Sequence, residues 1–97
     1  MADFILLMHD DAKSGSAQDW DTYLKRLRAS GSFEGGSAIG GGICVRKDGA
    51  TAPSIAKHLT GYLRVTATNL GEVMKLLAGN PVYEAGGTVE IRGLPRD

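Results

Sequence analysis

The sequence predicts an α+β domain whose elements follow one another in the order β-α-β-β-α-β. Short apolar or alternating runs of strand length lie at residues 4–8, 43–47, 60–67 and 88–92. Two amphipathic stretches with helix-capping residues separate the first pair and the last pair of these runs. A chain of 97 residues is expected to form one domain, residues 1–97.

The first strand is expected at Phe4–Met8, an unbroken apolar run. Such a run is typical of a strand that is covered on both of its faces. The polar cluster His9-Asp10-Asp11 ends the strand and is expected to form a turn. Because adjacent side chains point in divergent directions, a turn is a better interpretation of this cluster than a metal site.

The clearest helix is expected over residues 17–30. Ser16 is a good N-cap, and Asp19 three residues later completes a pair that resembles a capping box. Gly31 follows as the residue that ends the helix. An apolar stripe, expected to pack in the core, runs along one side of it: Trp20, Tyr23, Leu24 and Leu27.

A glycine-rich segment, residues 35–42, comes before the second expected strand. It lacks the Lys-Ser/Thr ending of a phosphate-binding loop, so we expect it to join or bend strands. The strand is expected at Ile43–Lys47 and is followed by a turn at Asp48-Gly49 and a loop over residues 50–57. Its faces alternate, Ile43 and Val45 against Cys44 and Arg46.

The third strand and the second helix are adjacent in the sequence. Residues 60–67 alternate as a half-covered strand does, and Asn69 is a good N-cap with Glu72 three residues later. Gly79 is expected to end that helix, and Pro81 prevents its continuation. The last strand is expected over residues 88–92.

This order of elements favours a ferredoxin-like arrangement, a four-stranded antiparallel sheet with both helices on one face. The side chains expected to face the helices are Leu63, Val65, Val89, Ile91, Ile43 and Val45. Those expected on the opposite, open face are Cys44, Arg46, Tyr62, Arg64, Thr66, Thr88, Glu90 and Arg92. The first strand adds to that face either Phe4, Leu6 and Met8 or Ile5, Leu7 and His9.

An open face that is half apolar and half charged predicts a second copy of the chain as its cover, in a two-fold homodimer. A net positive cleft between the copies would suit a small anionic metabolite. The ligand-binding candidates are Arg46, Arg64, Glu90 and Arg92, and the catalytic candidates are His9 and Tyr62. The alternative is a solvated face with cross-strand Arg–Glu pairs.

Composition excludes several other classes of function. Eleven basic and eleven acidic residues give a net charge of zero, so nucleic acid is not expected as a partner. No apolar run has the length of about 18–20 residues that a membrane span needs, so no membrane partner is expected. Cys44 is the single cysteine, which fits a cytoplasmic protein and a small apolar strand residue. No residues have metal-ligand spacing, and neither a metal nor a cofactor is expected.

Several segments resemble a known family. The pattern W-x-x-Y-x-x-x-L-x-x-S-G runs from Trp20 to Gly31, and Phe33-Glu34-Gly35-Gly36 follows it. Gly61-Tyr62-Leu63, Asn80-Pro81 and the ending Gly87–Arg92 extend the match over most of the chain. Together these segments resemble the YCII-related family, and more closely its DGPF-type branch.

The resemblance implies a ferredoxin-like subunit that pairs into a dimeric α+β barrel. Some members are proposed to be enzymes because a His–Asp pair lies in their cleft, and related barrels include lactone isomerases and monooxygenases. Here no histidine lies near Trp20–Tyr23, and Asn80 stands where the aspartate is expected. Asn80 cannot act as a carboxylate base. A loop around residues 51–54 replaces the DGPF motif itself.

Three functions remain open on the sequence alone. The first is a homodimer that binds a small anionic or aromatic metabolite in a cleft. The second is an isomerase-like or hydrolase-like enzyme of the same fold that uses His9 or Tyr62. The third is a protein-interaction module that uses the open face or an edge strand.

Overall fold

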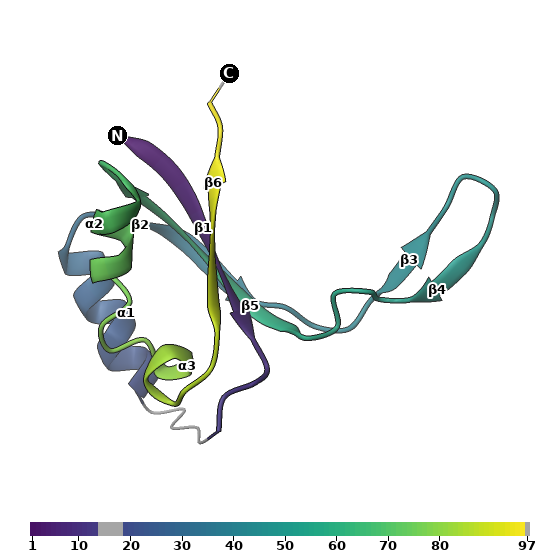
Figure 1. Ribbon diagram of the computed structural model, residues 1–97, viewed down its shortest axis with the longest axis horizontal. Coiled ribbons are helices and arrows are strands. Elements are labelled where there is room, and N and C mark those ends of the chain that lie inside the picture. The colour runs from purple at the N-terminus through teal and green to yellow at the C-terminus, as the bar shows by residue number, and fades with distance from the viewer. Residues whose placement is uncertain (14–18, 97) are drawn as a thin grey trace.

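A computed structural model describes residues 1–13 and 19–96 of the chain (Figure 1). The elements are β1 (Ala2–His9), α1 (Asp19–Ala29), β2 (Phe33–Ala38), β3 (Ile43–Val45), β4 (Thr51–Pro53), β5 (Leu59–Ala67), α2 (Leu70–Lys75), α3 (Pro81–Glu84) and β6 (Val89–Leu94). Ser16, the expected N-cap of the first helix, lies outside the described residues. None of the helices found in residues 1–13 and 19–96 is long and apolar enough to cross a membrane.

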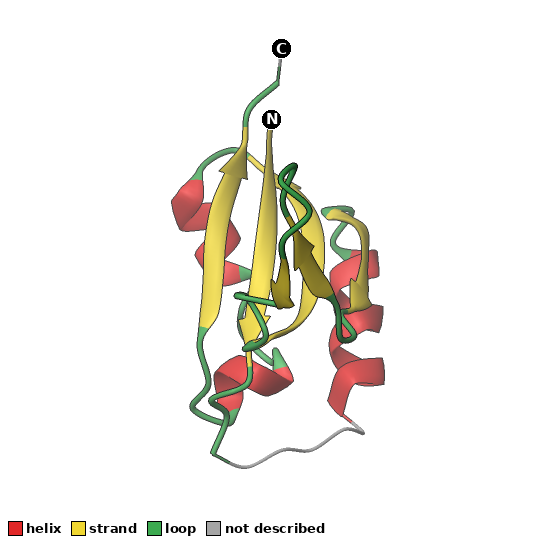
Figure 2. Cartoon of the chain, turned by 90° about the vertical axis from the view of Figure 1, so that its right-hand side faces the viewer, coloured by secondary structure: helices red, strands yellow, loops and turns green. Residues whose placement is uncertain are grey.

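Four strands form one antiparallel sheet in the order β2-β5-β1-β6. The three helices lie on one face of this sheet and leave the other face open (Figures 1 and 2). Strand β1 is central, because Leu6 lies opposite Leu63 of β5 and opposite Ile91 of β6. The predicted ferredoxin-like arrangement, with a four-stranded antiparallel sheet and helices on one face, is confirmed.

The core lies between this sheet and the helices. Its buried members are Leu6, Met8, Tyr23, Leu27, Leu63, Val65, Ala67, Val73 and Leu77. Phe4, Val89 and Ile91 pack against them. Because Leu6 and Met8 face the helices, alternation along β1 places Ile5, Leu7 and His9 on the open face. The second of the two alternatives for the first strand is therefore correct.

The prediction for the second strand of the sheet was wrong. That strand is β2, Phe33–Ala38, rather than residues 43–47. The glycines of β2 hid it from a search for apolar alternation, yet the sheet requires one of them. A Cβ atom on Gly36 would lie 2.5 Å from the Tyr62 carbonyl oxygen and 2.7 Å from Leu63 Cδ2.

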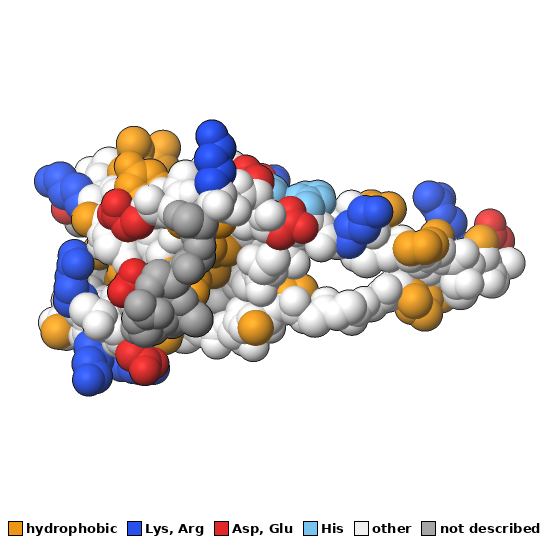
Figure 3. All heavy atoms as spheres, turned by 90° about the horizontal axis from the view of Figure 1, so that it is seen from below, with side chains coloured by type: hydrophobic (Ala, Val, Ile, Leu, Met, Phe, Trp, Pro, Cys, Tyr) orange, Lys and Arg blue, Asp and Glu red, His pale blue; other side chains and the backbone are white. Residues whose placement is uncertain are grey.

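Residues 43–47 belong instead to a separate hairpin, in which β3 pairs with β4. Ile43 and Val45, which were expected to face the helices, are 70% and 68% exposed. The expected loop over residues 50–57 contains β4. We call residues 40–57 the arm, because they project away from the body of the molecule with hydrophobic side chains on their surface (Figure 3).

The arm has a well-formed turn at its tip. The Arg46 backbone N–H donates to the Ala50 carbonyl oxygen at 2.9 Å, and the Ala50 N–H donates to Asp48 Oδ1 at 2.8 Å. Gly49 has a φ of +88°, which is left-handed backbone that glycine adopts without a Cβ clash. The radius of gyration, 14.9 Å, exceeds the value of about 12.5 Å that a compact chain of this length would have.

The second helical region starts as predicted but ends earlier. Asn69 Oδ1 accepts a hydrogen bond from the Glu72 N–H at 3.0 Å and caps α2. Hydrogen-bonded turns replace the helix from Leu76 onwards. A short further helix, α3, then begins at Pro81, and the Asn80 side chain caps it. These caps account for the sharp changes of direction between β5 and β6.

Leu6 is 0% exposed at the centre of the core, so Leu6→Ala should lower the free energy of unfolding by about 2–5 kcal/mol. Met74→Ala is the matched control, because Met74 is 58% exposed on α2, and it should change that free energy by less than about 0.5 kcal/mol. Urea unfolding at one protein concentration measures both. Equal losses in the two variants would contradict the assignment of the core.

Candidate functional site

Two candidate sites lie on opposite faces of the sheet. One is a group of polar side chains on the open face, which contains most of the residues expected from the sequence. The other is a cavity between α1 and the sheet. Because successive residues of a strand point to opposite faces, the same strands build both sites.

The strand register brings five of the six sequence-predicted residues onto one face. Leu7 lies opposite Tyr62 on β5 and opposite Glu90 on β6. Ile5 in the same way lies opposite Arg64 and Arg92. We call the resulting set the open-face cluster: His9, Tyr62, Arg64, Glu90 and Arg92, around the apolar Ile5 and Leu7.

The open-face cluster contains a histidine–carboxylate pair. His9 Nε2 lies 3.0 Å from Glu90 Oε1, and Arg92 Nη1 lies 3.2 Å from Glu90 Oε2. The hydrogen bond from His9, followed by that from Arg92, lowers the pKa of Glu90 below its ordinary value of 4.5. On the other side, the His9 ring stacks on His58 with 5.0 Å between ring centroids. The imidazole is therefore held in one orientation.

This geometry suits proton transfer. When Nε2 of His9 carries the hydrogen and its N–H donates a hydrogen bond to Glu90, Nδ1 is the ring nitrogen with a free lone pair. A carboxylate that orients an imidazole in this way is a recurring arrangement of general-base catalysis. The sequence pointed to both residues but not to their pairing, because the register between β1 and β6 cannot be read from either strand alone.

Arg46 does not belong to this cluster. The prediction placed it on the open face because residues 43–47 were taken as a strand of the sheet, and the structure places it at the turn of the arm. Cys44, for the same reason, lies in the hairpin rather than in the sheet. The expected ligand site on the open face therefore loses one of its arginines within a single copy.

The prediction that His9-Asp10-Asp11 forms a turn was wrong for His9, which is the last residue of β1, while Asp10 forms a bend after the strand. Asp11 accepts hydrogen bonds from the Thr88 N–H at 2.7 Å and from Thr88 Oγ1 at 2.6 Å. These bonds lower the pKa of the Asp11 carboxyl, with the Thr88 side chain as the larger cause. The carboxylate thus ties the end of β1 to the start of β6 and supports the strand pair that carries His9 and Glu90. Among the described residues, no group of three or more His, Cys, Asp or Glu side chains could hold a metal ion.

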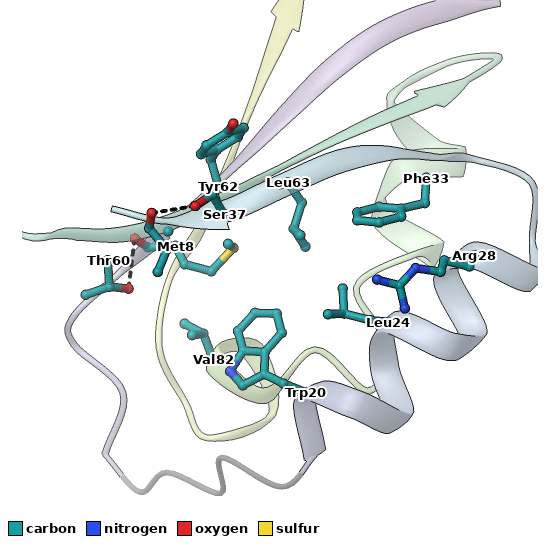
Figure 4. Close-up of a pocket in the computed structure, with 13 residues that line it drawn as sticks. Met8, Trp20, Leu24, Arg28, Phe33, Ser37, Thr60, Tyr62, Leu63 and Val82 are labelled. Atoms are coloured by element: carbon teal, nitrogen blue, oxygen red, sulfur yellow. Dashed lines mark hydrogen bonds between the residues drawn. The ribbon is translucent and has the colours of Figure 1, made fainter. Parts of the chain in front are cut away.

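The cavity between α1 and the sheet has a volume of about 460 Å³ and is mainly apolar (Figure 4). Trp20 and Leu24 point into it from α1, and Phe33 and Leu63 line it from the sheet. Tyr62 lies on the other side of its strand, toward the open face. Tyr62 also contributes to the lining of the cavity, so the two sites meet at this residue, while their other side chains lie on opposite faces of the sheet.

Arg28 supplies the charge at this cavity. Its guanidinium carbon lies 5.5 Å from the centroid of the Phe33 ring, within cation–π range. The sequence contained a signal for this position, because Trp20, Leu24 and Arg28 are spaced by four residues and share one side of a helix. The signal was missed because an arginine at a helix C-terminus is also expected from the helix dipole alone.

The core expectation for the first helix was correct for Tyr23 but incomplete for Trp20. Tyr23 is 2% exposed, its hydroxyl donates to the Leu76 carbonyl oxygen at 2.8 Å, and burial raises its pKa. Asn80 is fully buried, and its Oδ1 accepts from the N–H groups of Val82 and Tyr83. Its Nδ2 makes no hydrogen bond within the described part of the chain. Neither Tyr23 nor Asn80 supplies the histidine or the carboxylate of the His–Asp pair that lies in the cleft of some members of the YCII-related family.

The hydrogen bond between His9 and Glu90 predicts a specific change in titration. His9→Ala should raise the pKa of Glu90 toward 4.5, and Arg92→Ala should raise it less, because His9 is the larger cause of its lowering. Carboxyl ¹³C chemical shifts against pH measure this. The Asp3 carboxyl is an internal control, since its pKa is lowered chiefly by the hydrogen bond from Arg96.

The same pair implies a direction for stability. A carboxyl whose pKa is lower in the folded chain stabilises the fold above its unfolded-state pKa, and this contribution is lost as the pH falls through the folded-state pKa.

A Glu90 pKa that is unchanged in His9→Ala would show that the hydrogen bond does not form in solution.

No family model matches the chain, and no curated protein matches its sequence. Among solved structures, the fold is similar to that of 5-chloro-2-hydroxyhydroquinone dehydrochlorinase from Burkholderia phenoliruptrix AC1100, in complex with 2,5-dihydroxybenzoquinone. The TM-score is 0.61 at 17% sequence identity, and the match covers 98% of this chain and 95% of that chain. At this identity the likeness establishes a shared fold alone.

Proposed function

We propose that the chain forms a homodimer that binds a small aromatic anion in the cavity between α1 and the sheet. The cavity itself carries this proposal. Its volume of about 460 Å³ lies within the range of roughly 300–1,000 Å³ that small-molecule sites occupy. Its mainly apolar lining with one nearby cation also matches the usual composition of such sites.

The lining residues indicate the class of ligand. Trp20 and Phe33 offer aromatic rings against which a planar ring can stack. Arg28 is exposed at the cavity, and its guanidinium can pair with a carboxylate through two parallel hydrogen bonds or with a phenolate oxygen through one. The structure with the similar fold contains 2,5-dihydroxybenzoquinone, a planar ring with acidic hydroxyl groups, which supports the same class.

The homodimer part of the proposal rests on the open face. In a single copy, Ile5 and Leu7 are covered only in part, and none of the helices in the described part of the chain packs on this side of the sheet. A second copy in a two-fold contact would bury both residues in both copies. The formal net charge of zero means that two copies do not repel one another as a whole.

A second candidate function is proton-transfer catalysis by the open-face cluster, and the His9–Glu90 hydrogen bond favours it. In this scheme Nδ1 of His9 accepts a proton from an acidic C–H or O–H group of a molecule bound at the open face. Glu90 stabilises the resulting imidazolium, and Arg64 provides positive charge for the anion that forms. The proton then returns to the molecule or passes to water.

Trp20 is the single tryptophan, so its fluorescence reports directly on the cavity. Titration with 4-hydroxybenzoate should change this fluorescence saturably. Arg28→Gln should weaken binding about 3–10-fold, the loss expected for one exposed charge-assisted hydrogen bond. Lys25→Gln removes the same charge from an exposed position on the same helix and should leave affinity unchanged.

Calorimetry with 2,5-dihydroxybenzoquinone, which absorbs light and disturbs fluorescence, repeats the comparison. Equal weakening in Arg28→Gln and Lys25→Gln would assign the effect to overall charge instead of to the cavity. A fluorescence signal that never saturates with either molecule would contradict binding there.

Proton transfer has its own test. In D₂O, the protein should accelerate exchange of the ring hydrogens of 2,5-dihydroxybenzoquinone for deuterium, followed by ¹H NMR. His9→Gln should reduce this acceleration about 10²-fold or more, the usual contribution of a general base, and Glu90→Gln should reduce it less. Lys75→Gln on the surface of α2 is the control. Exchange at the wild-type rate in His9→Gln would exclude His9 as the base.

A further inference from the structure

We propose that the arm is a clasp that packs its apolar face against the body of a second copy of this chain. This inference rests on the homodimer proposed above and assigns part of its contact surface. The chain is tied to the body at both ends of the arm. The Ile39 N–H donates to the Thr60 carbonyl oxygen at 3.0 Å, and the Asp10 N–H donates to the His58 carbonyl oxygen at 2.9 Å.

One face of the arm is apolar and uncovered. The hairpin register pairs Ile43 with Pro53 and Val45 with Thr51, so these four side chains lie on the same face. Ile43 and Val45 are 70% and 68% exposed, and Ile55 nearer the root is 85% exposed. An isolated two-stranded hairpin is only marginally stable in water, so a hairpin with this surface gains stability from a partner.

Its own body does not supply that partner. Strands β3 and β4 form a two-stranded sheet of their own, separate from the main sheet. The polar turn at the tip, closed by the Asp48 and Arg46 hydrogen bonds, gives the hairpin a defined shape. The arm is thus a structured projection with an apolar face, rather than a loose connection between β2 and β5.

Its direction points to a second copy. The arm leaves the β2 and β5 end of the sheet on the side away from the helices, which is the side of the open face (Figures 1 and 2). Each copy therefore has an L shape, and it exposes apolar side chains both on the open face of the sheet and on the arm. In a two-fold contact, the open face and the apolar face of the arm would be covered in both copies by the other copy.

The reach of the arm fits this arrangement. Two sheets that pack face to face lie about 10 Å apart. The eight residue steps from Ile39 to Lys47 span about 26 Å at roughly 3.3 Å per residue. The arm is therefore long enough to cross the gap between the two sheets and contact the edge of the partner sheet. Arg46, which is absent from the open face of its own copy, is carried toward the partner.

The arm is also connected to the open-face cluster. His58 lies where the arm rejoins the body, and its ring stacks on that of His9 at 5.0 Å. Docking of the arm would hold this end of β5 and thereby the surroundings of His9. The second copy would in this way help to order the candidate proton acceptor.

Sedimentation velocity of the full chain over a range of concentrations tests the proposal. The wild type should be a dimer at micromolar concentration. Ile43→Asp with Val45→Asp should raise the dimer dissociation constant about 100-fold or more, because four buried aliphatic side chains per dimer are replaced by charges. Leu70→Asp with Met74→Asp is the matched control, with a similar exposed apolar pair on α2, and should leave the constant unchanged.

A second variant tests whether the double substitution acts only by misfolding the arm. Replacement of residues 42–54 by a short Gly-Ser linker leaves the four-stranded sheet intact and should weaken the dimer to the same degree. A dimer of unchanged affinity in both arm variants would overturn the clasp and leave the homodimer standing. A wild type that is monomeric at 100 µM, roughly 5.5 kcal/mol of standard binding free energy, would overturn both.

Discussion

Strand β1 carries apolar side chains on both of its faces, and the rest of the structure depends on covering them. It lies between β5 and β6, so its edges are fully used by backbone hydrogen bonds. Leu6 and Met8 are buried beneath the helices, which explains why α1 and α2 pack on that face. Ile5 and Leu7 point the other way, where one copy of the chain covers them only in part. The proposed association with a second copy rests on this constraint rather than on a motif.

The same alternation separates two kinds of chemistry. Met8 and Leu63 line the cavity beneath α1, while their neighbours His9 and Tyr62 lie on the open face. A register shift of one residue would exchange the two sets, so the apolar pattern that fixes the fold also fixes which residues can react. The cavity is the proposed binding site and has no base, whereas the open face has the proposed base, His9, and no cavity of its own. A second copy is what would convert the latter into an enclosed site.

Much of this organisation could be predicted from the sequence, because it depends on local periodicity. The alternation in β5 and β6 placed Tyr62, Arg64, Glu90 and Arg92 on one face, and the Asn69 cap located the start of α2. From the sequence, residues 43–47 were assigned to the sheet in place of β2, and local periodicity could not prevent this error. Apolar alternation in an exposed arm looks like that of a core strand, and a glycine strand has no pattern to detect.

The candidate sites depended on information of longer range. The pairing of His9 with Glu90 needs the register between two strands whose paired residues are 81 positions apart in the chain, and the cavity needs the spacing between α1 and β2. Neither distance is encoded in a short window of sequence. Asn80 shows the reverse case, since its place before Pro81 marks it as a helix cap without reference to the rest of the fold.

The cover on the open face is the central claim, and isotope-filtered NMR tests it most directly. In an equimolar mixture of ¹³C-methyl-labelled and unlabelled chains, only contacts between copies give filtered NOEs. We expect such NOEs from the methyl groups of Ile5 and Leu7 to protons of the unlabelled chain. Methyl NOEs that arise only within one copy, in a sample at millimolar concentration, would contradict the account.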